Sequence, residues 1–106
     1  ITANASDVRL KKNFIPIGSA LARVRAITGY TFDWDVEKMQ AAGFAVTYPH
    51  DLGVVAQEVQ KVLPEAVAPA PANKEYLTVR YEKLTALLIQ AVKELSAEVE
   101  LLKARG

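Results

Sequence analysis

Cysteine is absent from this chain of 106 residues, which excludes disulfides and thiolate metal sites. Histidine occurs once, so imidazoles cannot cluster around a metal ion, and we expect neither a metal nor a cofactor. No apolar run approaches the roughly 18 residues of a membrane-spanning helix, so no membrane partner is expected. The stretch from Ile1 to Asp7 lacks the basic start and apolar run of a signal peptide.

An excess of charge of one sign is also missing. Thirteen Lys and Arg residues face 12 Asp and Glu residues, which gives a formal charge of +1. Phosphate backbones are bound by clustered basic side chains, so we do not expect a nucleic-acid partner. The nearest cluster, Arg9 with Lys11 and Lys12, is interpreted as a solvated surface. With 51% hydrophobic and 24% charged residues, the composition is that of one globular domain.

The strongest pattern lies near the C-terminal end, where aliphatic residues alternate at spacings of four and three. This spacing is typical of a coiled-coil seam, here formed by Leu88, Val92, Leu95, Val99 and Leu102. Charged residues are expected on the wet flanks: Lys93, Glu94, Glu98, Glu100 and Lys103. Valine at a with leucine at d does not separate two strands from three. A lone chain would expose this seam, and a domain of this size gains needed burial by associating, so the pattern predicts an assembly module.

The remaining patterns predict a helix-dominated α+β fold, in which a small globular body with short strands or a hairpin precedes the long helix. We expect residues 1–5 to be a linker from the preceding part of a longer protein, 6–80 the body, with 35–50 as a projecting arm, and 81–106 the coiled-coil helix. The first half of the chain is expected to contain a strand or extended arm over 6–14, a helix from Ile17 to Thr28, a strand over 29–34, and an excursion or hairpin over 35–50. The second half is expected to contain a helix capped by Asp51 and stopped by Pro64, a loop or edge over 66–73, a strand over 76–80, and a helix from Tyr81 to Ala104.

Few side chains suggest chemistry. His50 beside a proline is typical of a surface turn, and the aromatic residues Tyr30, Phe32 and Trp34 suit either a stacking platform or a core. A lysine removed from water can lose its proton and act as a base for a serine hydroxyl, which makes Ser6 and Lys11 a candidate dyad. Residues five apart face opposite sides of a strand and lie about 140° apart on a helix. The dyad therefore needs a bend or a neighbouring subunit; otherwise the pair is a turn serine followed by a solvated lysine.

Three motifs resemble one known family. They are Ser6-Asp7-Val8-Arg9-Leu10-Lys11, then residues 53–59 with 63–65, and finally residues 81–84 running into 87–95. Together they cover nearly the whole chain in the family's order. The chain resembles the self-cleaving intramolecular chaperone domains at the C-terminus of bacteriophage tailspikes and tail fibres, including endosialidases. A related domain occurs in membrane-anchored eukaryotic transcription factors that release themselves by the same cut.

The resemblance implies that Ser6 is the nucleophile and Lys11 its basic partner, in a serine peptidase that cuts its own chain once, around Ala5, Ser6 and Asp7. It also implies a homotrimer that drives folding of an upstream β-structured fibre in the host cytoplasm and is then released from the virion fibre. Residues 35–49 match no family pattern; insertions there form arms that hold the upstream fibre. The alternatives are a trimerisation domain that stays attached, and the transcription-factor version.

Overall fold

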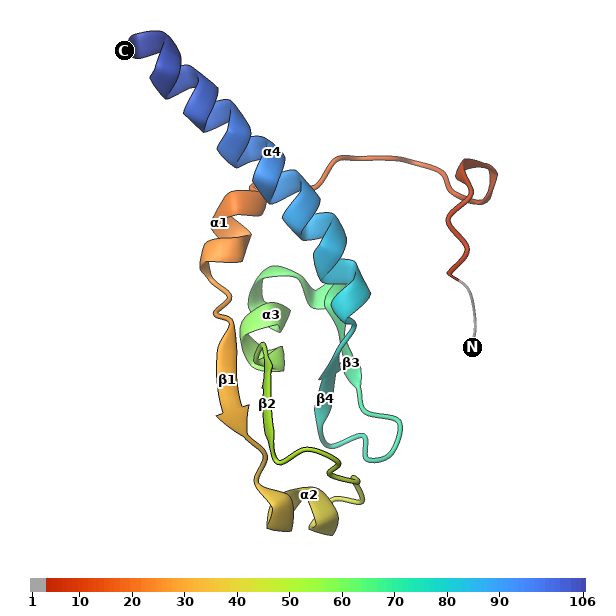
Figure 1. Ribbon diagram of the computed structural model, residues 1–106. Helices are drawn as coiled ribbons and strands as arrows, with labels where there is room; N and C mark the ends of the chain where they lie inside the picture. Colours follow the sequence, from red (N-terminus) through yellow and green to blue (C-terminus); the bar gives the residue numbers. More distant parts are fainter. Residues whose placement is uncertain (1–3) are drawn as a thin grey trace.

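The computed structural model describes residues 4–106 and confirms the α+β class (Figure 1). Residues 1–3 of the expected linker lie outside the described residues. A 3₁₀ turn, η1, lies in the N-terminal arm at Val8–Leu10, and the body follows. The body contains α1 Ala20–Arg25, β1 Tyr30–Asp33, α2 Val36–Ala41, β2 His50–Gly53, α3 Ala56–Val62, η2 Pro64–Ala66, β3 Val67–Pro69 and β4 Leu77–Val79, and the chain ends in α4 Tyr81–Arg105.

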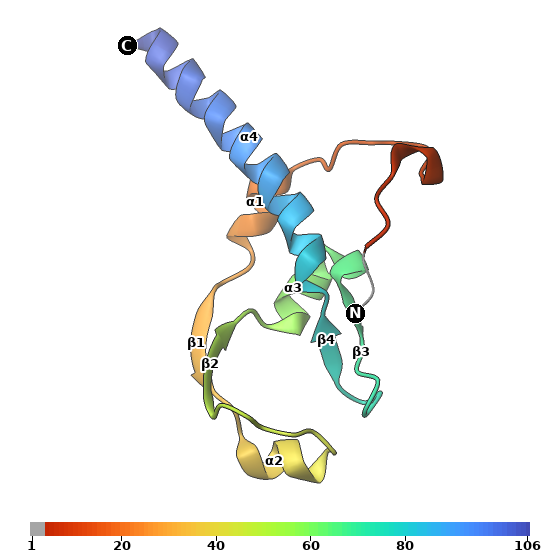
Figure 2. The same cartoon turned by 45° about the vertical axis from the view of Figure 1, so that its right-hand side comes forward.

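Two antiparallel strand pairs give the body its outline. Strand β1 pairs with β2, with Tyr30 opposite Gly53, and β3 pairs with β4, with Val67 opposite Val79. The two pairs extend from the level of α3 away from α4, and α2 lies at the far end of the first pair (Figures 1 and 2). Their far ends meet, because the Asn73 amide donates to the carbonyl of Ala42 at 3.1 Å.

A small apolar core joins α1, α3, η2 and α4. Its buried members are Ala20, Val59, Leu63, Ala66, Leu87 and Ala91. Half-buried aliphatic residues surround them, and no buried polar side chain is found within residues 4–106. A core of six buried side chains is small for a chain of this length, so association with further copies would add needed burial.

The N-terminal half of α4 packs on the body, and its C-terminal half extends beyond it (Figure 1). Leu87 and Ala91 are buried in the packed half, whereas every residue from Leu95 to Arg105 is exposed. The radius of gyration is 17.5 Å, above the about 13 Å of a compact domain of 100 residues. Within residues 4–106, no helix is long and apolar enough to cross a membrane.

One glycine is required where β2 meets α4. A Cβ atom added at Gly53 would stand 2.6 Å from the Tyr81 hydroxyl oxygen, well inside contact distance. That hydroxyl accepts a hydrogen bond from the backbone N–H of Val54 at 3.3 Å. The close approach therefore ties the end of the first strand pair to the start of the long helix.

The helix capped by Asp51 was predicted wrongly. Asp51 lies in β2 opposite Phe32, and its carboxylate accepts hydrogen bonds from the Leu52 N–H at 2.8 Å and the Trp34 indole at 3.3 Å. Helix α3 begins only at Ala56 and has no side-chain cap. The pairing with β1, which is distant in sequence, thus overrides the local capping signal.

The other elements lie close to their predicted positions. Helix α1 is shorter than the predicted Ile17 to Thr28, and the predicted loop or edge at 66–73 contains β3. Asp35 caps α2 by accepting from the Lys38 N–H at 3.1 Å, so the excursion over 35–50 begins with a helix. The arm over 6–14 contains no strand; outside the 3₁₀ turn η1 it is irregular, with a bend at Asn13, where φ is 58°.

Candidate functional site

The turn η1 brings the two predicted catalytic side chains together. The ammonium Nζ of Lys11 donates a hydrogen bond to the Ser6 hydroxyl Oγ at 2.8 Å. Backbone hydrogen bonds from Leu10 N–H to the Asp7 carbonyl at 3.0 Å and from Lys11 N–H to the Val8 carbonyl at 3.2 Å reverse the chain between them. This is the bend that a pair of residues five apart requires.

An ion pair lies inside this turn. One Asp7 carboxylate oxygen accepts from the backbone N–H of Arg9 at 2.9 Å and from its guanidinium Nε at 3.1 Å, and the other accepts from Nη2 at 2.9 Å. These bonds lower the pKa of Asp7 below its ordinary 3.8 and raise that of Arg9. Because the pKa of Asp7 is lowered on folding, the pair is present above that ordinary value and is lost only as the pH falls through the lower value.

The dyad is fully open to solvent in a single chain. Every residue from Asn4 to Pro16 is exposed, and Figure 1 shows η1 and its flanking residues apart from the body. The hydrogen bonds and ion pairs found for residues 6–12 all lie within the arm. Its large apolar side chains are also exposed, among them Leu10 at 73% and Ile15 at 85%. The arm thus has the composition of a segment that another surface covers.

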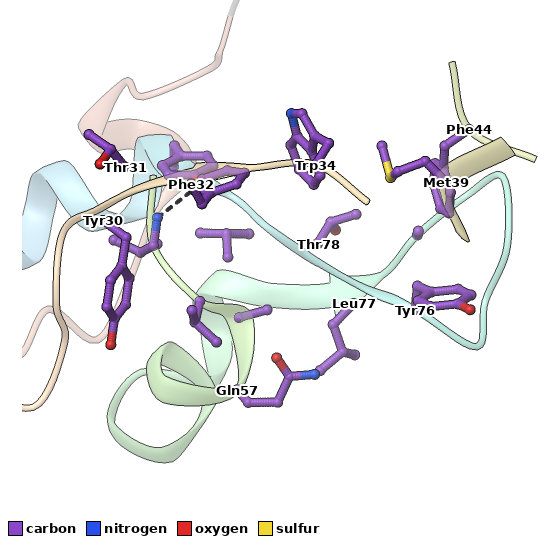
Figure 3. A pocket seen from close by; sticks show the side chains of 16 residues that line it. Tyr30, Thr31, Phe32, Trp34, Met39, Phe44, Gln57, Tyr76, Leu77 and Thr78 are labelled. Carbon is purple, nitrogen blue, oxygen red and sulfur yellow. Dashed lines mark hydrogen bonds between the residues drawn. The ribbon is translucent and has the colours of Figure 1, made fainter. Parts of the chain in front are cut away.

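A second feature, which the sequence did not reveal, is an apolar groove of about 760 Å³ between the two strand pairs (Figure 3). Trp34 and Met39 come from the β1–α2 side, Leu77 comes from β4, and Tyr76 directly precedes that strand. The aromatic strand residues therefore line an open groove and do not form a closed core. The rings of Phe32 and Trp34 meet edge to face at 4.9 Å, which holds the indole at the groove wall.

The third feature is the seam of α4, which has no partner in a single chain. Its five residues are between 41% and 63% exposed. At 100° per residue, the seam and the face that packs on the body (Leu84, Leu87, Ala91 and Glu94) are centred roughly 80° apart around the helix. Other copies can therefore cover the seam without displacing the body.

Glu94 corrects one sequence expectation, because it does not lie on a wet flank. Its carboxylate accepts hydrogen bonds from the backbone N–H groups of Ala20 at 2.7 Å and Leu21 at 3.2 Å, at the start of α1. Ser19, at the N-cap position, has a left-handed φ of 51° and makes no side-chain cap. Glu94 therefore supplies the missing cap from 73 and 74 residues away.

We expect Glu94→Ala to destabilise the domain by about 1–2 kcal/mol, because two helix N–H groups lose their charged acceptor. Chemical denaturation at one fixed protein concentration measures this loss. Glu98→Ala is the matched control, since Glu98 lies on the exposed part of the same helix, and its effect should stay within about 0.5 kcal/mol. Equal effects of the two substitutions would contradict the capping role.

Together, the fold and the site define a small α+β domain with a Ser–Lys pair on an N-terminal arm and an unpartnered apolar stripe on a long C-terminal helix. The family described as the chaperone of endosialidase, which is classed as a peptidase family, matches residues 6–68. The chain belongs to this family.

Relatives of known name agree with this assignment. The chain is 41% identical over 102 residues to the long tail fiber protein Gp37 of Enterobacteria phage K3, across 94% of this chain and 8% of that protein. The Gp37 protein of Enterobacteria phage T2 gives the same identity, across 7% of its length. The Gp37 protein of Enterobacteria phage M1 is 34% identical over 100 residues, across 92% of this chain and 38% of that protein. The predicted resemblance to tail-fibre chaperone domains is thus confirmed.

Proposed function

We propose that this domain is a C-terminal intramolecular chaperone that trimerises, drives folding of an upstream tail-fibre β-fold, and then releases itself by cleavage at Ser6. The 2.8 Å contact between Lys11 Nζ and Ser6 Oγ is the observation that carries the cleavage. Membership of a chaperone family and the likeness to long tail fibre proteins support the chaperone part. Assembly takes place in the host cytoplasm, and the domain leaves the finished fibre.

The proposed reaction begins when Ser6 Oγ attacks the carbonyl carbon of Ala5, a path that closes an unstrained five-membered ring. Neutral Lys11 accepts the hydroxyl proton and returns it to the Ser6 amide nitrogen as the carbon–nitrogen bond breaks. Water then hydrolyses the resulting ester, which leaves a carboxylate on Ala5 and a free amine on Ser6. Attack on the carbonyl of Ser6 itself would close a four-membered ring, so cleavage between Ser6 and Asp7 is the less favoured alternative.

The open position of the arm gives this reaction a natural order. Lys11 can accept a proton only after it has given one up, and removal from water favours that neutral form. A single chain leaves Lys11 in solvent, so the cover has to come from neighbouring chains or from the folded fibre. We infer that assembly precedes cleavage.

The free seam of α4 supports the trimer. Three chains joined along this seam would hold their upstream segments at high effective concentration and in common register. Intertwined β-folds form slowly because their contacts are distant in sequence, so this alignment assists the step that limits folding. Cleavage then makes assembly irreversible, and the released fibre persists behind a high unfolding barrier. Residues 35–50, beside the apolar groove, form a second projecting segment, distinct from the N-terminal arm, that contacts the fibre.

Expression of the chain with several hundred upstream residues, followed by intact-mass measurement, tests the cleavage. We expect the wild type to yield two products that meet at Ala5 and Ser6, whereas Ser6→Ala and Lys11→Ala precursors stay whole. Lys12→Ala is the matched control, because Lys12 is an exposed neighbour of Lys11, and it should cut like the wild type. Full cleavage of both dyad variants would refute the Ser6–Lys11 mechanism, whereas an uncut wild type would leave an attached trimerisation domain as the better description.

A further inference from the structure

The segment between Ser6 and Lys11 contains a clasp, which we define as Asp7 together with Arg9. Three hydrogen bonds between 2.9 and 3.1 Å join the two residues, and one of them caps the backbone N–H of Arg9 in η1. Both side chains are exposed, and their bonds lie within the arm. The clasp thus binds nothing else among the described residues, yet it lies at the centre of the dyad's loop.

The clasp accounts for the shape of the turn. A three-residue 3₁₀ turn is weak alone, because nucleating a helical turn fixes several dihedral angles for few hydrogen bonds. Among residues 4–106, no buried side chain of the arm anchors it to the body. The Asp7 cap and the Arg9 fork are therefore the side-chain interactions that hold Lys11 beside Ser6.

The clasp also keeps the Asp7 carboxylate from pairing with the Lys11 ammonium group. Asp7 and Lys11 are four residues apart, a spacing at which a free carboxylate and an ammonium group pair on a helical turn. Arg9 occupies both Asp7 oxygens instead, and Lys11 has no ion-pair partner among residues 4–106. A carboxylate paired with Lys11 would hold it in the charged form, which cannot take the Ser6 proton. Lys12 is the remaining charged group of this arm segment, and no charged side chain from another described element bonds to the arm.

We propose that Asp7 and Arg9 are positioning residues for the dyad: together they shape the turn, and Arg9 diverts the Asp7 carboxylate from Lys11. This inference rests on the proposed self-cleavage. The two roles have different signatures. Loss of the turn lowers the cleavage rate at every pH, whereas release of the carboxylate also moves the pH dependence of cleavage toward alkaline values.

The test uses the full precursor and measures the cleavage rate by time-resolved intact mass over a range of pH. Arg9→Ala should cut roughly 10- to 100-fold more slowly than the wild type at neutral pH, as expected for a displaced catalytic group. Its pH profile should move toward alkaline pH by about 0.7 unit or more, because a strong exposed ion pair already supplies that much and a pair covered by the assembled chains is screened less. Arg9→Lys keeps the positive charge but not the two-pronged guanidinium contact with Asp7. Its pH profile should therefore lie close to that of the wild type, while its cleavage rate stays low.

The double variant Asp7→Asn with Arg9→Ala isolates the charge effect. Asparagine retains the cap acceptor but carries no charge to pair with Lys11, so this precursor should cut slowly while its pH profile returns to the wild-type position. If the wild type cuts and the Ser6→Ala precursor does not, the proposed function stands. An Arg9→Ala precursor that then cuts with the wild-type rate and pH profile would overturn the role of the clasp alone. A profile that stays alkaline in the double variant would overturn the charge role. An uncut wild type would overturn the proposed function and the clasp with it.

Discussion

A chain carrying Leu95→Asp is expected to sediment as a monomer where the wild type sediments as a trimer. Leu95 is 46% exposed in the single chain and lies in the half of α4 that extends beyond the body, so the substitution leaves the protomer folded. In a trimer it would bring three carboxylates into one buried layer, which costs several kcal/mol. Sedimentation equilibrium at tens of micromolar protein measures the difference, a range set by ordinary association energies.

Leu101→Asp provides the matched control for this experiment. Leu101 is 56% exposed on the same helix, but at 100° per residue it lies on the side away from the seam. This variant should remain a trimer. A wild-type dimer would favour the two-stranded alternative that valine at a and leucine at d leave open, and a wild-type monomer would refute the assembly. The Leu95→Asp precursor should also cut slowly, because its Lys11 stays in water.

The helix that carries this prediction was the element most fully predictable from sequence. Tyr81 to Ala104 was expected, and Tyr81–Arg105 is observed, because helical periodicity is a local signal that repeats over many turns. The packing of its first half against α1 follows from the wider apolar face there. The role of Glu94 could not be predicted, because its partners lie 73 and 74 residues away and are backbone groups that carry no sequence signal.

The contact between Ser6 and Lys11 was expected here from the family resemblance. Periodicity placed Ser6 and Lys11 on different faces, since neither a strand nor an α-helix brings residues five apart together. The local signal that was missed is Asp7 followed two residues later by Arg9, a cap and its clasp around one 3₁₀ turn. An aspartate preceding a short turn is a recognised cap, so this bend could have been found from the sequence.

The groove between the strand pairs could not have been found in this way. Its walls come from residues 30–57 and 70–81, and the groove exists only after both hairpins form and their far ends meet. The same distant pairing misled the prediction of a helix capped by Asp51. An aspartate before an apolar stripe has the local pattern of a helix start, but pairing with β1 decided the structure there.

The last prediction separates chaperone from peptidase. A precursor with Ser6→Ala should still yield a folded, trimeric upstream fibre that keeps this domain as an uncut tail. A precursor that ends before Ser6 should yield aggregated upstream chains. The reason is spatial: the dyad lies on the N-terminal arm and the seam on α4, and no hydrogen bond found within residues 4–106 joins arm residues 6–12 to that helix (Figure 1). Register-setting and bond cleavage can therefore be lost independently.

Size-exclusion chromatography and resistance to hot detergent measure the two outcomes. Folding of a fibre through distant pairing exposes strand edges for long times, and unaligned chains then aggregate. The uncut fibre should resist detergent less well than the cleaved one, because an attached domain offers a route for reversal that cleavage removes. Lys12→Ala, which retains both seam and dyad, should match the wild type in yield and in resistance. If chains that lack the domain reach the native trimer at normal yield, the chaperone role is wrong, and a trimerisation domain that merely stays attached or is trimmed away accounts for the seam.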